Sequence, residues 1–486
     1  MPTFFKNKFQ NILFLRSHYV LLFYFILFFV SFLILFNSVA VFSITILFIF
    51  VTIFGFYLCN LTAYKLKDNK LRILGLFWLL KIGLTIMLFY IGWLPELNPN
   101  NSSWGYDPQR FYLQSIELLD NDWDNSFVSL NYKGILYYYA LIFSLFGRNP
   151  VIPALVNIFV TLIGTLFLIR SAYNFVRHRK SSDWLISLTL LIPEVLWYDV
   201  MTSRESLMSV LLVLIIMSIG NYLNKFSKSI LRTITVVVLS LLGIMAVRTS
   251  MVIPALISIF FITFFLKSEN KLNALAIKLF FVLLIIIAMF SGTVIIGSFG
   301  SGDIDYLSTL ERLQSPTVSI DDPVFWSQNS IGLLLVPTNI FESLLFLIPR
   351  MLLYLVSPLP NISVSVLALW SGSWSAFQSL MTIPTSLLIM LGFPFVLSAS
   401  EYSWHLRKIQ PSLLIIPISF WVIFISVAGG NQYIHERYRI MSTMLLFTTM
   451  WIGYTRCNNK LNKKWFLIWF LLLFVGVIFY LIIKFI

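Results

Sequence analysis

Charged residues are scarce in this chain. Asp, Glu, Lys and Arg make up only 11% of its 486 residues, whereas 59% of the residues are hydrophobic. A soluble domain has about a quarter of its residues charged, so this composition excludes an ordinary soluble protein. The apolar residues form repeated runs of about 20 residues, the length of a transmembrane helix. Because these runs are continuous rather than alternating, they also exclude a β-barrel.

Cysteine, histidine and acidic residues are few as well. The two cysteines, Cys59 and Cys457, fall at predicted cytoplasmic helix ends, where a disulfide is not expected. The four histidines show no spacing with cysteine that is typical of a metal site. Acidic residues number 20 against 34 basic ones, which gives a formal net charge of +14. Basic cytoplasmic segments facing anionic lipid explain this excess, so we expect a lipid bilayer and no nucleic acid as partner.

The basic residues are concentrated in segments between the apolar runs. Seven such segments hold 23 of the 34 Lys and Arg but only 4 of the 20 Asp and Glu. They are residues 1–18, 59–72, 170–183, 224–232, 267–278, 399–410 and 455–464. The positive-inside rule places these segments in the cytoplasm. We therefore predict one polytopic all-α domain over residues 1–486, with the N-terminus inside and the C-terminus outside.

The apolar runs predict a transmembrane helix bundle of about 13 spans. The predicted spans are residues 19–36, 39–58, 73–93, 151–169, 184–199, 206–223, 233–247, 249–266, 276–298, 377–398, 411–428, 438–454 and 465–484. The first run is too long for a signal-peptide core and lacks a small-x-small cleavage site, so we interpret it as a retained anchor.

Two regions are predicted outside the membrane core on the outer face. Residues 94–148 form the first outer loop, which includes the short apolar run 132–146. If that run crossed the membrane, the basic residues 177–180 would move outside, so we predict a helix lying in the outer interface. Residues 299–376 form a second outer loop followed by a proline-interrupted region, which is a re-entrant element, a surface-lying element or a pair of short spans.

Polar motifs from four separate segments are predicted on this outer face. They are Gly105–Tyr112 with Asp107 and Arg110, Ser203–Ser206 with Arg204 and Glu205, Arg248–Ser250, and His435–Arg439 with Glu436 and Arg437. A lone carboxylate such as Asp107 can be a general base or a metal ligand, but it can also cap a helix that begins at Pro108.

The arginines of these motifs allow two interpretations. A guanidinium forks onto phosphate, and the start of the predicted helix 438–454 favours an anion. Alternatively, Arg204 pairs with Asp199 or Glu205 and reaches the surface, while Arg248 is a turn residue at the bilayer edge. Because the four motifs come from separate helices and share one face, we predict a lipid-phosphate site beside one or two carboxylates.

At these residues the chain resembles the GT-C superfamily, polytopic glycosyltransferases that use polyprenyl-phosphate-linked sugars. The similarity is to its protein mannosyltransferase-like and aminoarabinose transferase-like members. The segment Asp107–Tyr112 is similar to the family's Asp-x-x-x-Tyr motif in the first outer loop. Lys133–Tyr138 and Leu145–Gly147 are similar to its Lys-Pro-Pro-Leu-Tyr-Tyr helix ending in Leu-Phe-Gly, without the proline pair. Arg248 is similar to a later arginine that begins an apolar helix in many members, and Glu436–Arg439 resembles their terminal Glu-x-Arg-Tyr/Phe-Arg-like motif.

The resemblance implies a GT-C-like bundle and a function. The enzyme would transfer a sugar or oligosaccharide from a polyprenyl-(di)phosphate donor to an acceptor glycan, lipid or protein, on the outer face of a bacterial inner membrane. Its catalytic residues would be Asp107 and Glu205. Its donor phosphate would be held by Arg110, Arg204, Arg248, Arg437 and Arg439, with Lys133, Tyr137, His435 and Glu436 in support. No cofactor is certain, and a divalent metal (Mg or Mn) held by Asp107 stays open.

Two alternative functions remain. A polymerase of O-antigen or capsule repeat units would use similar chemistry on lipid-linked oligosaccharides. A flippase or other transporter of lipid-linked oligosaccharides would need charges along a path through the membrane and is often built from inverted repeats. The nearest charges within apolar runs are Lys81, Glu342 and Arg350, and no internal repeat is visible.

Overall fold

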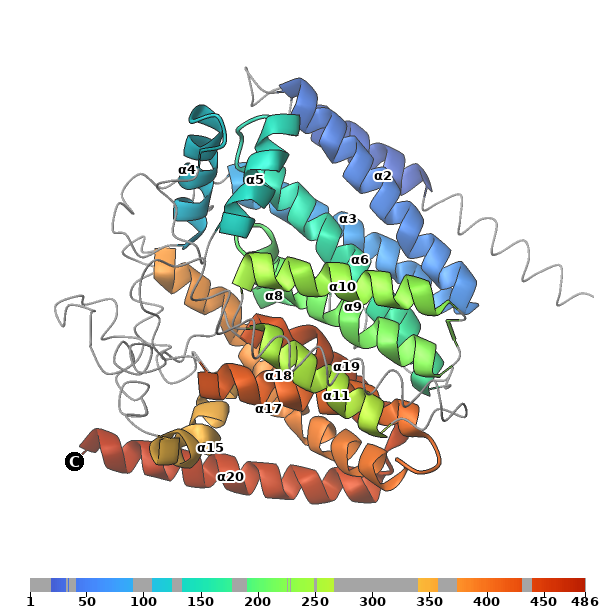
Figure 1. Ribbon diagram of the computed structural model, residues 1–486, viewed down its shortest axis with the longest axis vertical. Helices are drawn as coiled ribbons and strands as arrows, with labels where there is room; N and C mark the ends of the chain where they lie inside the picture. Colours follow the sequence, from blue (N-terminus) through green and yellow to red (C-terminus); the bar gives the residue numbers. More distant parts are fainter. Residues whose placement is uncertain are drawn as a thin grey trace, which may run out of the picture.

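The helices of this protein lie side by side in one bundle, as Figure 1 shows. The computed structural model describes residues 19–31, 34, 41–90, 107–124, 133–176, 190–224, 226–227, 229–248, 251–265, 340–356, 374–430 and 439–485. Across these ranges the regular structure is entirely helical, with no strand. The predicted all-α class is therefore confirmed for the described part of the chain.

The long helices correspond closely to the predicted spans. They are α2 (Val41–Leu66), α3 (Ile73–Tyr90), α6 (Val151–Val176), α9 (Glu205–Leu223), α10 (Ile230–Arg248), α11 (Val252–Phe265), α17 (Trp374–His405), α18 (Ile415–Gly430), α19 (Ile440–Arg456) and α20 (Asn459–Phe485). The shorter elements are α4 (Asp107–Asp120), α5 (Lys133–Phe146), α8 (Pro193–Asp199), α15 (Ile340–Val356) and two 3-10 helices, Asn69–Arg72 and Pro411–Leu414.

Six helices of the described ranges are long and apolar enough to cross a membrane. They are Phe42–Leu66, Val151–Val176, Glu205–Leu223, Ile230–Arg248, Thr382–His405 and Pro411–Ala428. Length and composition therefore support six membrane-spanning helices within the described ranges. The predicted total is about 13, and one of those predicted spans, 276–298, lies outside the described residues. The predicted span 184–199 needs correction, because its described part is helical only from Pro193, after a turn at residues 190–192.

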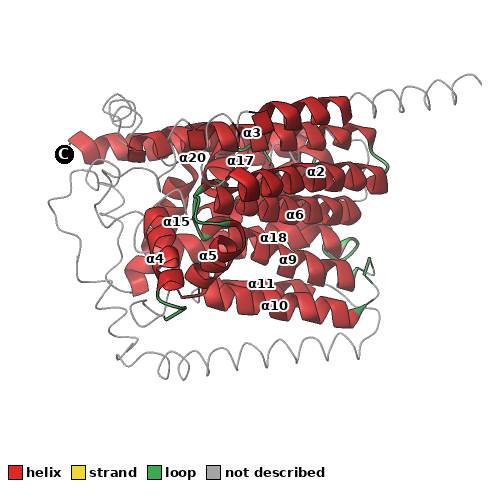
Figure 2. Cartoon of the chain, turned by 90° about the horizontal axis from the view of Figure 1, so that it is seen from above, coloured by secondary structure: helices red, strands yellow, loops and turns green. Residues whose placement is uncertain are grey.

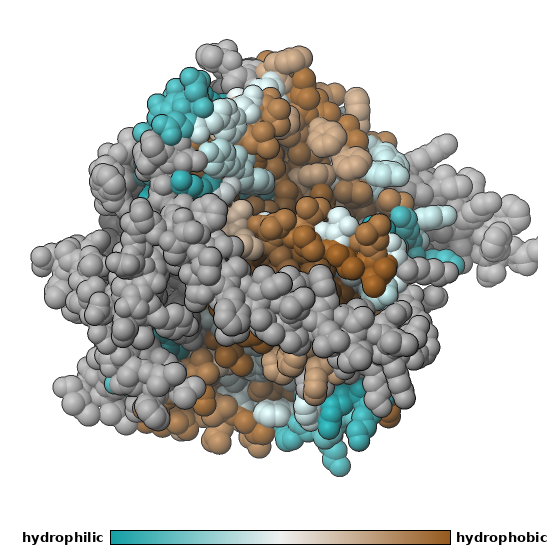
Figure 3. All heavy atoms as spheres, in the orientation of Figure 1, coloured by the Kyte–Doolittle hydropathy of each residue, from teal (hydrophilic) through white to brown (hydrophobic). Residues whose placement is uncertain are grey.

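The surface of the bundle has the character of a membrane protein. Figure 3 shows an apolar area over α2 and α10, between hydrophilic patches over α4 and at the opposite helix ends. Leu231, Leu239 and Leu242 on α10 are all exposed. Exposed leucines of this kind are costly in water but suit contact with lipid chains, so this area fits a bilayer.

Several basic segments meet at one end of the bundle. Tyr173 donates to Asp68 Oδ2 at 3.2 Å, and Gln410 donates to the Phe175 carbonyl at 2.9 Å. Arg456 donates to the carbonyl of Val176. These contacts join four segments that the charge pattern assigned to one side, 59–72, 170–183, 399–410 and 455–464. Cys59 is a buried free thiol and Cys457 a partly buried one.

The short helices α4 and α5 lie at the other end. Both run across the direction of the long helices (Figures 1 and 2). Helix α5 occupies the run predicted as an interfacial helix, and its buried residues Leu136, Tyr139, Ala140 and Phe143 form one helix face. A helix that crosses the bundle end with one apolar face packed inward has the geometry expected of an interfacial element.

The proline-interrupted region contains one described helix, α15. It includes Pro349 within its length and packs against α17 and α18. Arg350 on this helix is buried and donates to the Ala428 carbonyl at 2.8 Å, near the end of α18. This contact matches a cation to the negative end of a helix.

The close packing of α17 against α19 gives a testable prediction. A Cβ added at Gly453 would lie 1.9 Å from the carbonyl oxygen of Phe395, which is backbone and has little room to move. We expect Gly453→Ala to destabilise the protein by about 1–3 kcal/mol through overpacking. The measurement is thermal unfolding in detergent.

Gly476 on α20 provides the matched control, because an added Cβ there meets nothing within 4 Å. Gly476→Ala should leave the melting temperature unchanged or raise it, since alanine favours a helix. Equal melting temperatures for the two variants would show that α17 and α19 do not approach this closely.

Candidate functional site

Helix α8 contains two fully buried carboxylates in seven residues. Pro193 opens the helix, where its missing N–H costs no hydrogen bond, and Glu194 and Asp199 follow. Because a buried carboxylate needs a charged or hydrogen-bonding partner, each must be matched by another helix. The two have different partners.

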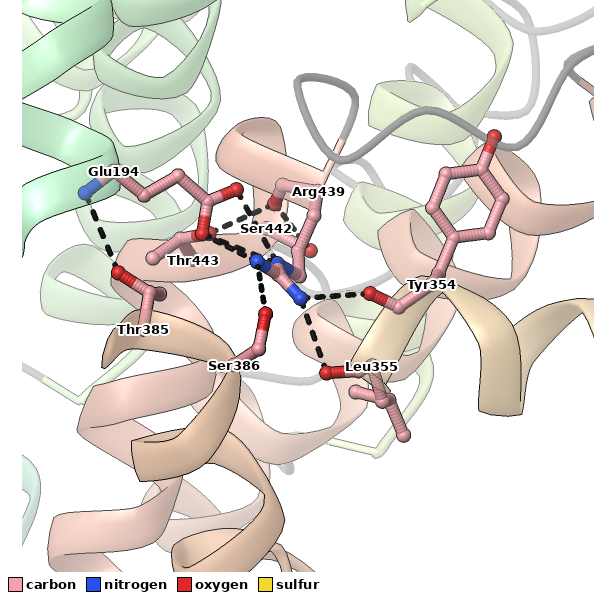
Figure 4. A network of polar contacts seen from close by, with 8 residues as sticks. All are labelled: Glu194, Tyr354, Leu355, Thr385, Ser386, Arg439, Ser442 and Thr443. Atoms are coloured by element: carbon pink, nitrogen blue, oxygen red, sulfur yellow. Dashed lines mark hydrogen bonds and ion pairs between the residues drawn. The ribbon is translucent and has the colours of Figure 1, made fainter. Parts of the chain in front are cut away.

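Glu194 is paired with Arg439, as Figure 4 shows. Arg439 Nη2 lies 2.6 Å from Glu194 Oε2, and Nε lies 3.2 Å from the same oxygen. Nη2 also donates to Ser386 Oγ at 3.1 Å, while Nη1 donates to the carbonyls of Tyr354 and Leu355 at 2.8 and 3.0 Å. The contacts occupy all five N–H donors of the guanidinium.

This arrangement revises the role predicted for Arg439. The sequence placed Arg439 on the outer rim as a ligand for the donor phosphate. The structure buries it completely, with its donors directed at Glu194, α15 and α17. A guanidinium whose donors are already used within the protein has none left for phosphate, so we assign Arg439 a structural role.

Asp199 is paired with Lys81, near the middle of α3, and both side chains are fully buried. Thr161 on α6 donates to the second carboxylate oxygen of Asp199 at 2.9 Å. The alternative pairing of Asp199 with Arg204 is therefore wrong. A lysine at this depth in a helix bundle is accommodated only by such a partner.

Arg204 and Glu205 lie just after α8, at the start of α9. Arg204 Nε is 3.8 Å from Glu205 Oε1, and its guanidinium carbon lies 5.9 Å from the centre of the Phe111 ring on α4. Arg204 is 7% exposed and Glu205 2% exposed. The alternative in which this pair reaches the surface is therefore wrong, because both side chains are buried.

The start of α5 and the end of α10 meet at the same end of the bundle. A Cβ at Gly134 would lie 2.2 Å from the carbonyl oxygen of Ala246, so the two backbones are in close contact. Lys133 and Arg248 flank this contact in sequence. Arg110 precedes Phe111 on α4 and donates to Gln114 at 3.3 Å.

Five predicted residues thus belong to elements that meet at one bundle end, and we call them the rim cluster: Arg110, Lys133, Arg204, Glu205 and Arg248. Tyr137 lies on the adjoining part of α5. Its ring stacks on Trp123 with centroids 6.0 Å apart, and its hydroxyl donates to the Trp123 carbonyl at 3.2 Å.

The remaining predicted site residues lie only partly within the described ranges. Helix α4 begins at Asp107, but the side chain of Asp107 lies outside the described part. His435, Glu436 and Arg437 lie outside the described residues. Within the described ranges, no group of three or more His, Cys, Asp or Glu side chains is arranged to hold a metal ion. The possible metal at Asp107 stays a prediction.

The buried pairs were partly visible in the sequence. Lys81 stands alone in an apolar run, and Glu194 follows a proline within another, so each was visible as an ionisable residue in a hydrophobic environment. Their partners are 118 and 245 positions away, and no local pattern links residues at such separations.

No family model matches this chain, and neither the curated proteins nor the solved structures contain a significant match. The class of protein is therefore inferred from its own helices and contacts. It is an α-helical membrane protein, with apolar helices of membrane-spanning length, buried ion pairs in the bundle and the rim cluster at one end.

The Glu194–Arg439 pair yields a stability prediction. Glu194→Gln keeps the shape of the side chain but leaves the buried charge of Arg439 without its counterion. We expect a loss of about 3–5 kcal/mol in the free energy of unfolding. Unfolding in detergent, followed by circular dichroism, measures it.

Asp120→Asn is the control, because it removes one partner of the Asp120–Arg148 pair, whose side chains are 52% and 51% exposed. That change should cost no more than about 1 kcal/mol. A Glu194→Gln protein as stable as the control variant would contradict a structural role for the buried pair.

Proposed function

We propose that this protein is a membrane glycosyltransferase of the GT-C type. It transfers a sugar or oligosaccharide from a polyprenyl-(di)phosphate-linked donor to an acceptor glycan, lipid or protein, at the outer face of a bacterial inner membrane. The observation that supports this proposal is the rim cluster. Basic residues from α4, α5, α10 and the turn before α9 belong to the bundle end that two crossing helices cover.

The chemistry of such a transfer fits that location. The phosphate of a lipid-linked donor lies at headgroup depth, while its polyprenyl chain lies among the acyl chains. The leaving phosphate gains negative charge in the transition state, so a fixed guanidinium nearby stabilises it more than it stabilises the donor. Arg204 is held beside Phe111 and Glu205 in a largely buried position, where such an interaction is strong.

Roles for individual residues follow from this proposal. Asp107 is the general base that activates the acceptor hydroxyl, at the start of α4. Arg110, Arg204, Arg248 and Arg437 hold the donor phosphate, with Lys133, Tyr137, His435 and Glu436 in support. Glu205, proposed as the second catalytic carboxylate, also orients Arg204 across their 3.8 Å contact. Arg439 leaves this set because it belongs to the buried pair.

The transporter alternative has one observation in its favour. Lys81–Asp199 and Glu194–Arg439 are ionisable pairs inside the bundle, and intramembrane charges are typical of transport paths. However, all four side chains are fully buried and are bonded to each other and to neighbouring protein groups. Enclosed pairs of this kind fit a structural role better than a water-lined path, so we favour the transferase. A polymerase of repeat units stays an alternative, because it would use the same sugar-transfer chemistry on lipid-linked oligosaccharides.

The proposal predicts the behaviour of Arg248→Ala and Asp107→Asn. Purified protein in nanodiscs would be given a panel of undecaprenyl-phosphate and undecaprenyl-diphosphate sugars. We expect transfer by the wild type, a decrease in kcat of about 10²- to 10³-fold for Arg248→Ala, and loss of activity for Asp107→Asn. The measurement is the appearance of glycosylated product.

Arg232 provides the matched control for Arg248. It is an exposed arginine of the same helix α10 at the opposite end of the bundle, so Arg232→Ala should retain full activity. A product of many repeat units would identify a polymerase. Absence of any transfer, together with movement of the lipid-linked sugar across vesicles, would support the transporter instead.

A further inference from the structure

The turn between α8 and α9 is unusual because it is almost completely buried. Residues 200–204 are each at most 7% exposed, and they connect Asp199 to Glu205. A turn normally lies at the surface, where water satisfies its carbonyl oxygens. In a buried turn, protein groups must donate to them instead.

Side chains of two other helices provide these donors. Asn157 on α6 donates through Nδ2 to the Met201 carbonyl at 2.8 Å. Tyr139 on α5 donates its hydroxyl hydrogen to the Ser203 carbonyl at 2.5 Å. The second Nδ2 hydrogen of Asn157 is donated to the Tyr139 hydroxyl at 2.9 Å, so the two residues act as one unit.

A third contact holds the beginning of the turn. Thr161 lies one helical turn beyond Asn157 on α6 and donates to Asp199, whose other oxygen faces Lys81. Thr161, Asn157 and Tyr139 therefore restrain the chain at three successive points between Asp199 and Ser203.

These restraints bear directly on Arg204. The Ser203 carbonyl belongs to the peptide group that joins Ser203 to Arg204, so the hydrogen bond from Tyr139 fixes the plane from which the Arg204 side chain departs. On the other side, the guanidinium lies over the Phe111 ring. Helix α4 in turn packs on α5, where the Tyr112 and Phe143 rings are 5.5 Å apart edge to face.

We infer that Tyr139 and Asn157 are positioning residues, which hold the turn so that Arg204 and Glu205 point into the predicted donor-phosphate site. What the site binds rests on the proposed function. How the turn is held rests on the hydrogen bonds of Tyr139 and Asn157 alone. Neither residue touches the donor; both act through the backbone of the turn.

Adjacent tyrosines on α5 allow a sharp test. Tyr139→Phe removes only the hydroxyl that holds Ser203. Tyr138→Phe removes a hydroxyl that lies 3.4 Å from Asn157 Oδ1, longer than an ordinary O–H···O hydrogen bond, and that makes no hydrogen bond with residues 200–204, all of which the structure describes. We expect Tyr139→Phe to lower kcat by about 10- to 100-fold through misplacement of Arg204, and Tyr138→Phe to change it little.

A double-mutant cycle separates positioning from general stability. If Tyr139 acts through the turn on Arg204, Tyr139→Phe has a smaller effect on kcat in an Arg204→Ala background, where only Glu205 remains to be misplaced. If its role is only structural, it lowers kcat by the same factor in both backgrounds. Equal factors would overturn the inference.

Hydrogen exchange of the backbone amides of residues 201–208 gives a readout that needs no substrate. Exchange should become faster in Tyr139→Phe than in Tyr138→Phe, because only the former releases the turn. This result supports the inference even when no donor of the panel is turned over, an outcome that counts against the proposed function alone. Equal exchange in the two variants overturns the inference.

Discussion

The pairing of two buried carboxylates on α8 is the constraint on which the arrangement of the bundle depends. Asp199 binds Lys81 of α3 and Thr161 of α6, whereas Glu194 binds Arg439, which also contacts α15 and α17. A charge removed from water is tolerated only beside its partner, so each pair allows few alternative arrangements of the helices around it. One short helix thereby joins elements from both halves of the chain.

The buried pairing of Asp199 also influences the rim cluster, because the turn that follows Asp199 leads to Arg204. The turn after α8 begins at Asp199 and ends at Arg204, and side chains of α5 and α6 restrain its carbonyls. The position of Arg204 over the Phe111 ring of α4 thus depends on buried hydrogen bonds rather than on a surface loop. Fixed charges in an enclosed site suit the sugar transfer proposed above, because they need no reorganisation as charge develops.

Some of the structure could be predicted because the relevant signals are local. The hydrophobic runs located α2, α6 and α10 to within a few residues at most ends, and the charge pattern identified α5 as a separate short helix. The span 184–199 was wrong in its described part because a proline and a buried turn interrupt an apolar run without changing its hydropathy. Arg439 was assigned to phosphate because an arginine at a helix start looks the same whether it faces a ligand or a carboxylate.

The sequence by itself determined that the described part of the chain is helical, that its helices suit a membrane, and that four of its basic segments belong together at one end. Hydropathy, helix formation and charge all depend on neighbours within a few residues, so the linear pattern contains them. Only the tertiary structure decided that Lys81 meets Asp199 and that Glu194 meets Arg439. It also decided that Tyr139 and Asn157 hold the turn before Arg204. Such contacts depend on how helices pack, and packing is set by the shapes and charges of many side chains at once.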